Sequence, residues 1–231
     1  MEIIDEYKTI TSTPAEGFYS EKRSKFYAFA HHVETEEQVK DIVQTYRKRF
    51  YDARHVCYAF MLGADSSLFR TNDDGEPSST AGKPILGQIV KNELTNILII
   101  VVRYFGGVKL GTSGLLVAYK TAAADAIDHA ETVTCQVEEE VVFNFPYVMM
   151  NDVMRIVKEM KPRIVSQNFD NTCQITLSIR KSEAEQLRTR LETERQVTIL
   201  TFCSVPKSSN IPNLPIKNNG FENAVLFLIA L

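Results

Sequence analysis

Cysteine is scarce in this sequence of 231 residues, and its four copies lie far apart. Cys57, Cys135, Cys173 and Cys203 form no Cys-x-x-Cys pair and no close Cys/His cluster. Zinc sites and disulfide frameworks in small proteins need such groupings, so the spacing argues against both. We therefore expect reduced thiols and no bound metal.

The sequence also lacks a hydrophobic run that could cross a membrane. The apolar run at the end of the chain starts at Ala224 and has eight residues, whereas a membrane-spanning helix needs roughly 20. The first residues, MEIIDEYKTI, have neither the basic start nor the apolar core of a signal peptide. We expect a cytoplasmic protein with no membrane partner.

Positive charge is not in excess either. With 26 Lys and Arg against 29 Asp and Glu, the formal net charge is -3 and the pI is about 5.9. This balance excludes a wholly basic nucleic-acid binder but leaves a local basic patch open. The hydrophobic fraction of 44% and the charged fraction of 24% are those of an ordinary globular protein. The length suits one large domain or two modest ones.

In the first part of the chain, strand and helix patterns are mixed. Strands are expected at residues 24–33, 54–62 and 96–105, and helices at residues 35–50, 85–94 and 115–130. Thr35 and Gln38 have the spacing of a capping box at the start of the first helix. Six consecutive apolar residues in the third strand predict burial on both faces.

The second part of the chain has a clearer order. Strands are expected at residues 138–147, 163–169, 172–180 and 196–205, with helices at 148–160 and 182–194 and a hairpin turn at 170–171. Ser182 and Glu185 have capping-box spacing. The order βαββαβ predicts a ferredoxin-like arrangement. We expect an α+β protein with domains at residues 1–134 and 135–205 and a flexible tail at residues 206–231, where Pro, Asn and Ser are frequent.

The stretch RYFGGVKLGTSGLL, residues 103–116, combines glycines with positive charge before a predicted helix. Glycines there free main-chain N–H groups to face an anion, and the helix N-terminus favours negative charge. Neither a Walker A nor a Rossmann pattern can be placed, because Thr112 stands where Walker A needs lysine. A loose likeness to the phosphate loop of galactokinase-type kinases remains. The other interpretation is a tight turn.

Turn-forming residues fill the stretch at residues 70–84, RTNDDGEPSSTAGKP, which is predicted to be a long loop. Asp73, Asp74 and Glu76 have oxygen ligands suited to a divalent cation. The alternative is a loop tied by its own Asx and Ser/Thr hydrogen bonds, with Gly75 and Gly82 at positive φ. A loop of this length in a compact domain is more often functional than idle.

Two further groups of residues invite a chemical interpretation. His55 and Cys57 share a strand face and suit either a nucleophilic pair or an ordinary buried cysteine beside a hydrogen-bonded histidine. The basic residues of the first part are dispersed in sequence but interleaved with Tyr104 and Phe105, as on RNA-binding surfaces. These basic residues are Arg23, Lys25, Arg54, Lys83, Arg103, Lys109 and Lys120.

Four segments together resemble the YigZ/IMPACT family. They are RSKF (23–26), ARHVCYAF (53–60), DDGEPSSTAGKPIL (73–86) and VVRYFGGVKLGTSGLLVAY (101–119). The resemblance implies that a signature loop of the family is formed by Asp73, Asp74, Gly75, Glu76, Pro77, Ser78, Thr80 and Gly82. Ser79 and Ser113 depart from the family pattern, which has glycine at both positions.

The resemblance implies a first domain with a ribosomal-protein-like βαβ fold and a left-handed crossover, and a second domain similar to the last domain of elongation factor G. It also implies a role in regulating translation. We expect a non-enzymatic protein, without a cofactor, that binds RNA, the ribosome or a ribosome-associated protein. The alternatives are an enzyme acting on a nucleotide or phosphorylated small molecule at Gly106–Gly114, and a protein-interaction module. The candidate binding residues are Arg54, His55, Lys83, Arg103, Tyr104, Gly106, Gly107, Lys109, Gly111, Thr112, Ser113 and Gly114.

Overall fold

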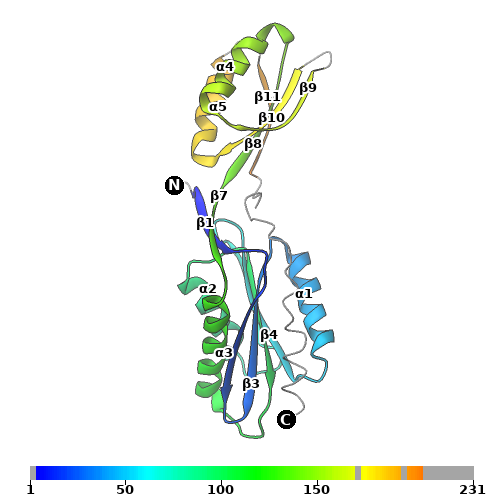
Figure 1. The fold of residues 1–231 in the computed structure, drawn as a ribbon, viewed down its shortest axis with the longest axis vertical. Helices are drawn as coiled ribbons and strands as arrows, with labels where there is room; N and C mark the ends of the chain where they lie inside the picture. Colours follow the sequence, from blue (N-terminus) through cyan, green and yellow to red (C-terminus); the bar gives the residue numbers. More distant parts are fainter. Residues whose placement is uncertain (1–3, 170–172, 194–196, 205–231) are drawn as a thin grey trace.

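The computed structural model describes residues 4–169, 173–193 and 197–204. Its elements form two layered α/β units placed end to end, with a narrow two-stranded connection between them (Figure 1). We call the five-stranded sheet with α1–α3 the N-terminal unit, and the four-stranded sheet with α4 and α5 the C-terminal unit. The predicted turn at 170–171 and the predicted tail at 206–231 lie outside the described residues.

The sheet of the N-terminal unit is fully antiparallel, with the strand order β2-β3-β6-β4-β5. The strands are β2 (Ala15–Glu21), β3 (Ser24–His32), β4 (His55–Leu62), β5 (Leu68–Asn72) and β6 (Ile97–Tyr104). The prediction that the third strand is buried on both faces is confirmed, because β6 is central and is buried from Ile97 to Arg103. The predictions of β3 and β4 are also confirmed, whereas β2 and β5 were not predicted.

Helices cover both faces of this sheet. α1 (Glu36–Arg49) packs on one face, and the predicted capping box of Thr35 and Gln38 is present at its start. α2 (Gly82–Lys91) and α3 (Gly111–Asp128) pack together on the other face (Figure 1). Both start a turn earlier than predicted. The predicted loop at 70–84 is therefore shorter, since β5 takes its first residues and α2 its last.

The C-terminal unit has the predicted order βαββαβ. Its strands are β8 (Glu138–Phe145), β9 (Arg163–Phe169), β10 (Cys173–Arg180) and β11 (Thr198–Ser204), and its helices are η1 (Tyr147–Met149), α4 (Met150–Met160) and α5 (Lys181–Thr193). The sheet order is β11-β8-β10-β9, and α4 and α5 share one hydrophobic core with the strands. The likeness to the last domain of elongation factor G and the handedness of the crossover stay predictions.

The predicted cap of α5 is wrong. The helix begins at Lys181, so Ser182 lies within its first turn. The carboxylate that serves this helix start belongs to Asp5, which accepts the Ser182 main-chain N–H at 2.9 Å and its hydroxyl at 3.0 Å. Asp5 also lies 3.2 Å from Arg180. A carboxylate that is distant in sequence therefore accepts hydrogen bonds at this helix start, where the local pattern predicted a serine cap.

A two-stranded antiparallel ribbon lies between the two units. β1 (Glu6–Ile10) pairs with β7 (Thr132–Gln136), and Tyr7, Cys135 and Val137 form a small buried cluster beside it. The predicted boundary between residues 134 and 135 falls inside β7. The division of the chain into domains at that boundary stays a prediction.

In the part of the chain that the structure describes, no helix combines the length and apolar character that crossing a membrane would require. The cytoplasmic location stays a prediction.

Candidate nucleic-acid interface

The segments singled out in the sequence meet at one end of the five-stranded sheet. β3 and β4 begin there and β5 and β6 end there, because the register pairs Lys25 with Tyr104 and His55 with Arg103. We call this the loop end; it is the end far from the C-terminal unit (Figure 1). It carries the acidic loop (residues 73–81) and the glycine loop (residues 105–110).

The carboxylates of the acidic loop are engaged in holding the loop itself. Asp73 accepts main-chain N–H groups from Ser79, Ala81 and Gly82 at 2.8, 3.0 and 2.8 Å. These hydrogen bonds pair main-chain N–H groups at the start of α2, where the N-cap residue itself provides no side-chain cap. Asp74 accepts the Val56 N–H at 2.7 Å and Arg47 Nη2 at 2.6 Å.

Glu76 is the buried centre of a polar network. Its Oε1 lies 2.5 Å from Arg103 Nη1 and 2.8 Å from Tyr119 Oη, and the Glu76 and Arg103 side chains are only 3% and 8% exposed. Such a pair is sustained only when each charge keeps its partner. Within the described residues, no group of three His, Cys, Asp or Glu side chains is placed to hold a metal ion.

Cys57 belongs to the same network. Its Sγ lies 3.1 Å from the main-chain oxygen of Asp73 and 3.3 Å from Tyr119 Oη. Burial raises the pKa of the Cys57 thiol and of Tyr119 well above their ordinary values. His55 turns to other partners: its Nδ1 donates to the main-chain oxygen of Asp74 at 2.7 Å, and Nε2 lies 3.9 Å from Glu76. This arrangement suits a buried protonated thiol rather than a nucleophile.

Glycine has a different role at each position of the two loops. A Cβ on Gly106 would lie 2.1 Å from the Arg23 carbonyl carbon, so only glycine permits this approach. Gly75, Gly107 and Gly111 have φ of +84°, +86° and +72°. The expectation of positive φ at Gly82 is wrong: this residue is needed because a Cβ would lie 2.8 Å from that of Thr71.

The two serines that depart from the family pattern differ in their backbone. Ser79 has φ of +66°, a left-handed conformation that glycine adopts more readily. Ser113 lies in the first turn of α3 and has no positive φ. The departure therefore strains the acidic loop and leaves the helix start unaffected.

The glycine loop and the start of α3 face solvent. Gly107, Lys109, Thr112 and Ser113 are exposed, and no side chain caps the helix at Leu110. Among the described residues, Lys109 makes no ion pair. Exposed N–H groups beside an unpaired lysine suit an anion.

A second cationic feature is a turn that was not predicted, although Arg23 was counted among the dispersed basic residues. Lys22 and Arg23 form the two-residue turn between β2 and β3, with φ of 48° and 66°. Turns of this geometry favour Asn-Gly, because both central residues need positive φ. Here the turn presents two exposed cations at the loop end instead. Lys-Arg is not a usual turn signal, so this turn could not be predicted from the residue types.

A row of aromatic side chains crosses the neighbouring strands near this turn. Phe18, Tyr27 and Tyr104 come from β2, β3 and β6, with ring centroids 5.1 Å apart for the first pair and 6.1 Å for the second. Phe18 is 48% exposed and the two tyrosines are half-buried. Tyr104 Oη donates to Asp52 at 2.7 Å, which fixes its ring. We call Phe18, Tyr27 and Tyr104 the aromatic row.

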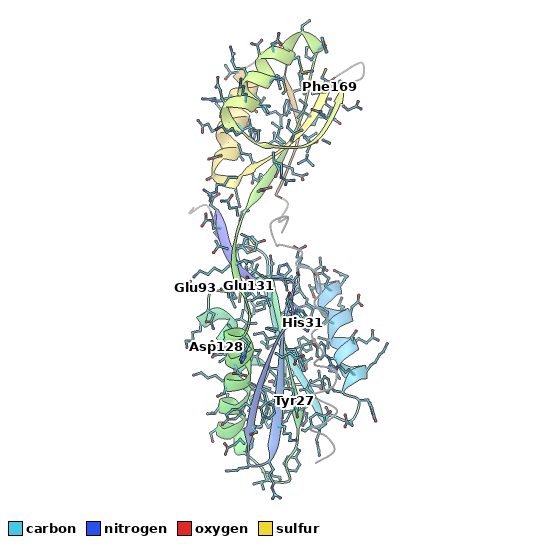
Figure 2. The ribbon with its side chains drawn as sticks, viewed as in Figure 1. Tyr27, His31, Glu93, Asp128, Glu131 and Phe169 are labelled. Carbon is cyan, nitrogen blue, oxygen red and sulfur yellow. The ribbon has the colours of Figure 1, made fainter. Side chains whose placement is uncertain are left out.

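Cations border the aromatic row. Lys25 is paired in register with Tyr104, and Arg54 directly precedes β4 beside the His55–Arg103 pair. Both are exposed, and neither has an ion pair within the described part of the chain. A carboxylate also lies beside the row, because Asp52 accepts the Tyr104 hydroxyl. Glu93, Asp128 and Glu131 lie farther from the loop end than Tyr27 does (Figure 2).

The structure thus separates the predicted binding residues into four places. Arg54 and Tyr104 lie by the aromatic row, whereas His55 and Arg103 belong to the Glu76 network on the opposite face. Lys83 lies in the first turn of α2, apart from both. Gly106, Gly107, Lys109, Gly111, Thr112, Ser113 and Gly114 follow the glycine loop into α3.

Comparison with known proteins places this arrangement in a family. Residues 22–127 match the Impact N-terminal domain. The chain is 33% identical over 150 residues to the IMPACT family member YigZ of Escherichia coli (strain K12), an alignment covering 64% of this chain and 74% of YigZ. The chain belongs to the IMPACT family. The resemblance of the four sequence segments to this family is confirmed.

Other members of the IMPACT family agree in sequence and fold. The Bacillus subtilis (strain 168) member YvyE is 37% identical over 112 residues, which is 48% of this chain and 52% of YvyE, so the chain spans about half the length of that relative. A crystal structure of a hypothetical protein matches 86% of this chain and 98% of its own, with a TM-score of 0.65 and 27% identity. The mixed α/β architecture is therefore shared.

Proposed function

We propose that this IMPACT family protein is a non-enzymatic, translation-linked protein that binds RNA, including RNA exposed on the ribosome, through the loop end. The observation that carries the proposal is the aromatic row with unpaired cations around it. Exposed rings offer stacking surfaces for bases, and cations beside them neutralise phosphates. The interface falls within residues 1–134, which we propose as the first domain.

Local charge reconciles this proposal with the negative net charge. Lys22, Arg23, Lys25, Arg54 and Lys109 all lie at the loop end, and none has an ion pair among the described residues. A cation that is already paired with a carboxylate gains little free energy from contact with a phosphate. An unpaired cation that contacts a phosphate releases counterions from the nucleic acid, and this release favours binding. The patch is therefore available although the whole chain is acidic.

Stacking of bases on the aromatic row adds binding free energy that the charged contacts alone do not supply. Phe18 and Tyr27 come from paired positions of β2 and β3, so their rings lie on the same face of the sheet as Tyr104. Proteins that read RNA sequence bind unstacked bases of single strands, which stack on aromatic side chains such as the exposed Phe18. Single-stranded RNA is accordingly the form that this surface suits.

The enzyme alternative has less support. A nucleotide-dependent reaction at the glycine loop would draw on Asp73, Asp74 or Glu76 to hold a divalent cation. Asp73 and Asp74 accept main-chain N–H groups and Glu76 is paired with Arg103. A thermal shift with ATP or GTP and Mg²⁺ tests this alternative directly, because a ligand that binds the native state raises its melting temperature.

Fluorescence anisotropy with a labelled single-stranded RNA, across a salt series, tests the RNA proposal. The variant Lys25→Glu/Arg54→Glu removes two exposed cations that hold nothing else together. We expect weaker binding and a log K against log salt slope reduced in magnitude by about 1.4, the value for two lost phosphate contacts on a single strand. Phe18→Ala should weaken binding with little change in that slope.

The matched control is Lys40→Glu/Lys91→Glu, which alters an exposed lysine near the start of α1 and an exposed lysine in the last turn of α2, both away from the loop end. It changes net charge equally but leaves the loop end intact. If both double variants lost RNA affinity equally, the loss would result from the change in net charge and not from the loop end, and the proposed interface would be wrong. Ribosome co-sedimentation with the same variants tests the link to translation; sedimentation unchanged by Lys25→Glu/Arg54→Glu would place ribosome contact elsewhere.

A further inference from the structure

A groove between α2 and α3 lies on the face of the sheet opposite the aromatic row. Ser79, Lys83, Pro84, Leu116, Val117 and Lys120 line it. Leu116 and Val117 are 41% and 55% exposed in the second turn of α3, although their neighbours Leu115, Ala118 and Tyr119 are buried. Its floor is thus apolar, and lysines stand on both helices that border it.

The charge of this face has one sign. α2 contains no Asp or Glu, and α3 contains none before Asp125. Lys83 and Lys120 are exposed and have no ion pair in the described part of the structure. An ordinary solvent-facing helix mixes both signs with few large apolar side chains, so the face is suited to a partner.

We propose that the α2–α3 groove binds an amphipathic helical segment of another protein that bears Asp or Glu beside its apolar stripe. Leucine-type side chains of the segment lie against Leu116, Val117 and Pro84, and its carboxylates meet Lys83 and Lys120. The complementarity of charge identifies the occupant as acidic. The apolar floor points to a protein segment, since the apolar stripe of an amphipathic helix fits such a floor and phosphates gain nothing from aliphatic side chains.

This inference does not depend on RNA binding at the loop end. The groove and the Glu76 network lie on the same side of the sheet, and the aromatic row lies on the other side. None of the residues that line the groove belongs to the aromatic row.

The test uses a fluorescent helical peptide of about 18 residues, roughly five turns, with leucine at i, i+3 and i+7 and glutamate at the flanks. Two control peptides replace either every glutamate by lysine or every leucine by serine. Anisotropy with the full chain should show binding of the first peptide at least about tenfold tighter than binding of either control, a difference of about 1.4 kcal/mol. Equal affinity for the serine peptide would overturn the proposal, because charge alone would then explain the binding.

The variant Val117→Glu/Lys120→Glu locates the binding in the groove. Both side chains are exposed, so the fold should persist, which circular dichroism checks. We expect at least about a tenfold loss of peptide affinity. The matched control Lys40→Glu/Val148→Glu changes a lysine on α1 and an apolar residue that is 78% exposed in η1. An equal loss in the control would contradict the proposal.

Other occupants give different outcomes. If Val117→Glu/Lys120→Glu weakens binding to single-stranded RNA or to anionic phospholipid vesicles while leaving the peptide unaffected, the groove serves one of those partners and the proposal is wrong. If the native chain dimerises on a light-scattering column and the variant does not, a second copy occupies it. Lys25→Glu/Arg54→Glu should keep peptide binding, so a failure of the RNA proposal is distinguishable from a failure here.

Discussion

The acidic loop and the glycine loop lie at the same end of the same sheet, and both are short and contain glycine. They use their polar groups in opposite ways. In the acidic loop, carboxylates are satisfied by Arg47, Arg103 and main-chain N–H groups. In the glycine loop, Lys109 and the start of α3 face water. One loop is a structural clamp, and the other is exposed to solvent.

This difference shows that composition alone does not distinguish a binding loop from a structural one. Asp73, Asp74 and Glu76 have the chemistry of metal ligands, yet each is already committed within the protein. The decisive quantity is whether a charged group has a partner in the folded chain. Substitutions in the clamp should therefore reduce stability, whereas substitutions of Lys109 should leave it unchanged.

The largest effect is expected from Glu76→Ala. Removing this carboxylate leaves Arg103 buried without its partner, which costs about 3–5 kcal/mol in the free energy of unfolding. Urea denaturation measures the loss. In the double variant Glu76→Leu/Arg103→Met, much of the stability should return, because both charges are gone. A Glu76→Ala loss below about 1 kcal/mol, the range of surface pairs, would contradict the clamp.

Gly106→Ala should have the next largest effect, a loss of about 3 kcal/mol at the upper end of overpacking costs. Its Cβ would lie 2.1 and 2.3 Å from main-chain atoms of Arg23 and Ser24, so the turn that carries two cations must move. Thermal and urea denaturation measure the loss. The control is Gly87→Ala in α2, where nothing lies within 4 Å; it should stabilise the helix by about 0.5–1 kcal/mol.

Alkaline pH should weaken the clamp through Cys57. Burial, the largest cause, raises the pKa of this thiol in the folded protein above its unfolded value. The contribution of this thiol to the free energy of unfolding is therefore fully present below about pH 8.5. It is lost as pH rises, because only the thiol of the unfolded chain ionises. By pH 10 the loss reaches about 2 kcal/mol. Urea denaturation from pH 7 to pH 10 should show a shallower decline for Cys57→Ser; parallel declines would show that Cys57 ionises in both states.

The smallest effect is expected from Ser79→Gly, which restores the family's glycine. The left-handed conformation at φ of +66° costs a non-glycine residue about 1–2 kcal/mol. The freer unfolded chain offsets about half of the relief. A net gain of about 0.5–1 kcal/mol in urea denaturation is the expected result. Ser113→Gly is the contrast, because a glycine in the helical first turn of α3 should give no gain.

Local patterns in the sequence determined several elements of this protein. The apolar run of β6 and the capping box of α1 act within a few residues, so their consequences could be predicted. The order βαββαβ of the second part follows from the same periodicities. The four sequence segments likewise identified the IMPACT family before any contact was known.

Only the tertiary structure decided which polar groups are free. Arg103 and Lys109 looked alike in sequence, but one is 8% exposed beside Glu76 and the other stands in solvent. Partners distant in the chain also start the helices, with Asp73 serving α2 and Asp5 serving α5. The aromatic row and the α2–α3 groove bring together residues from separate elements. Sequence patterns report neighbours along the chain, whereas pairing, burial and exposure depend on neighbours in space.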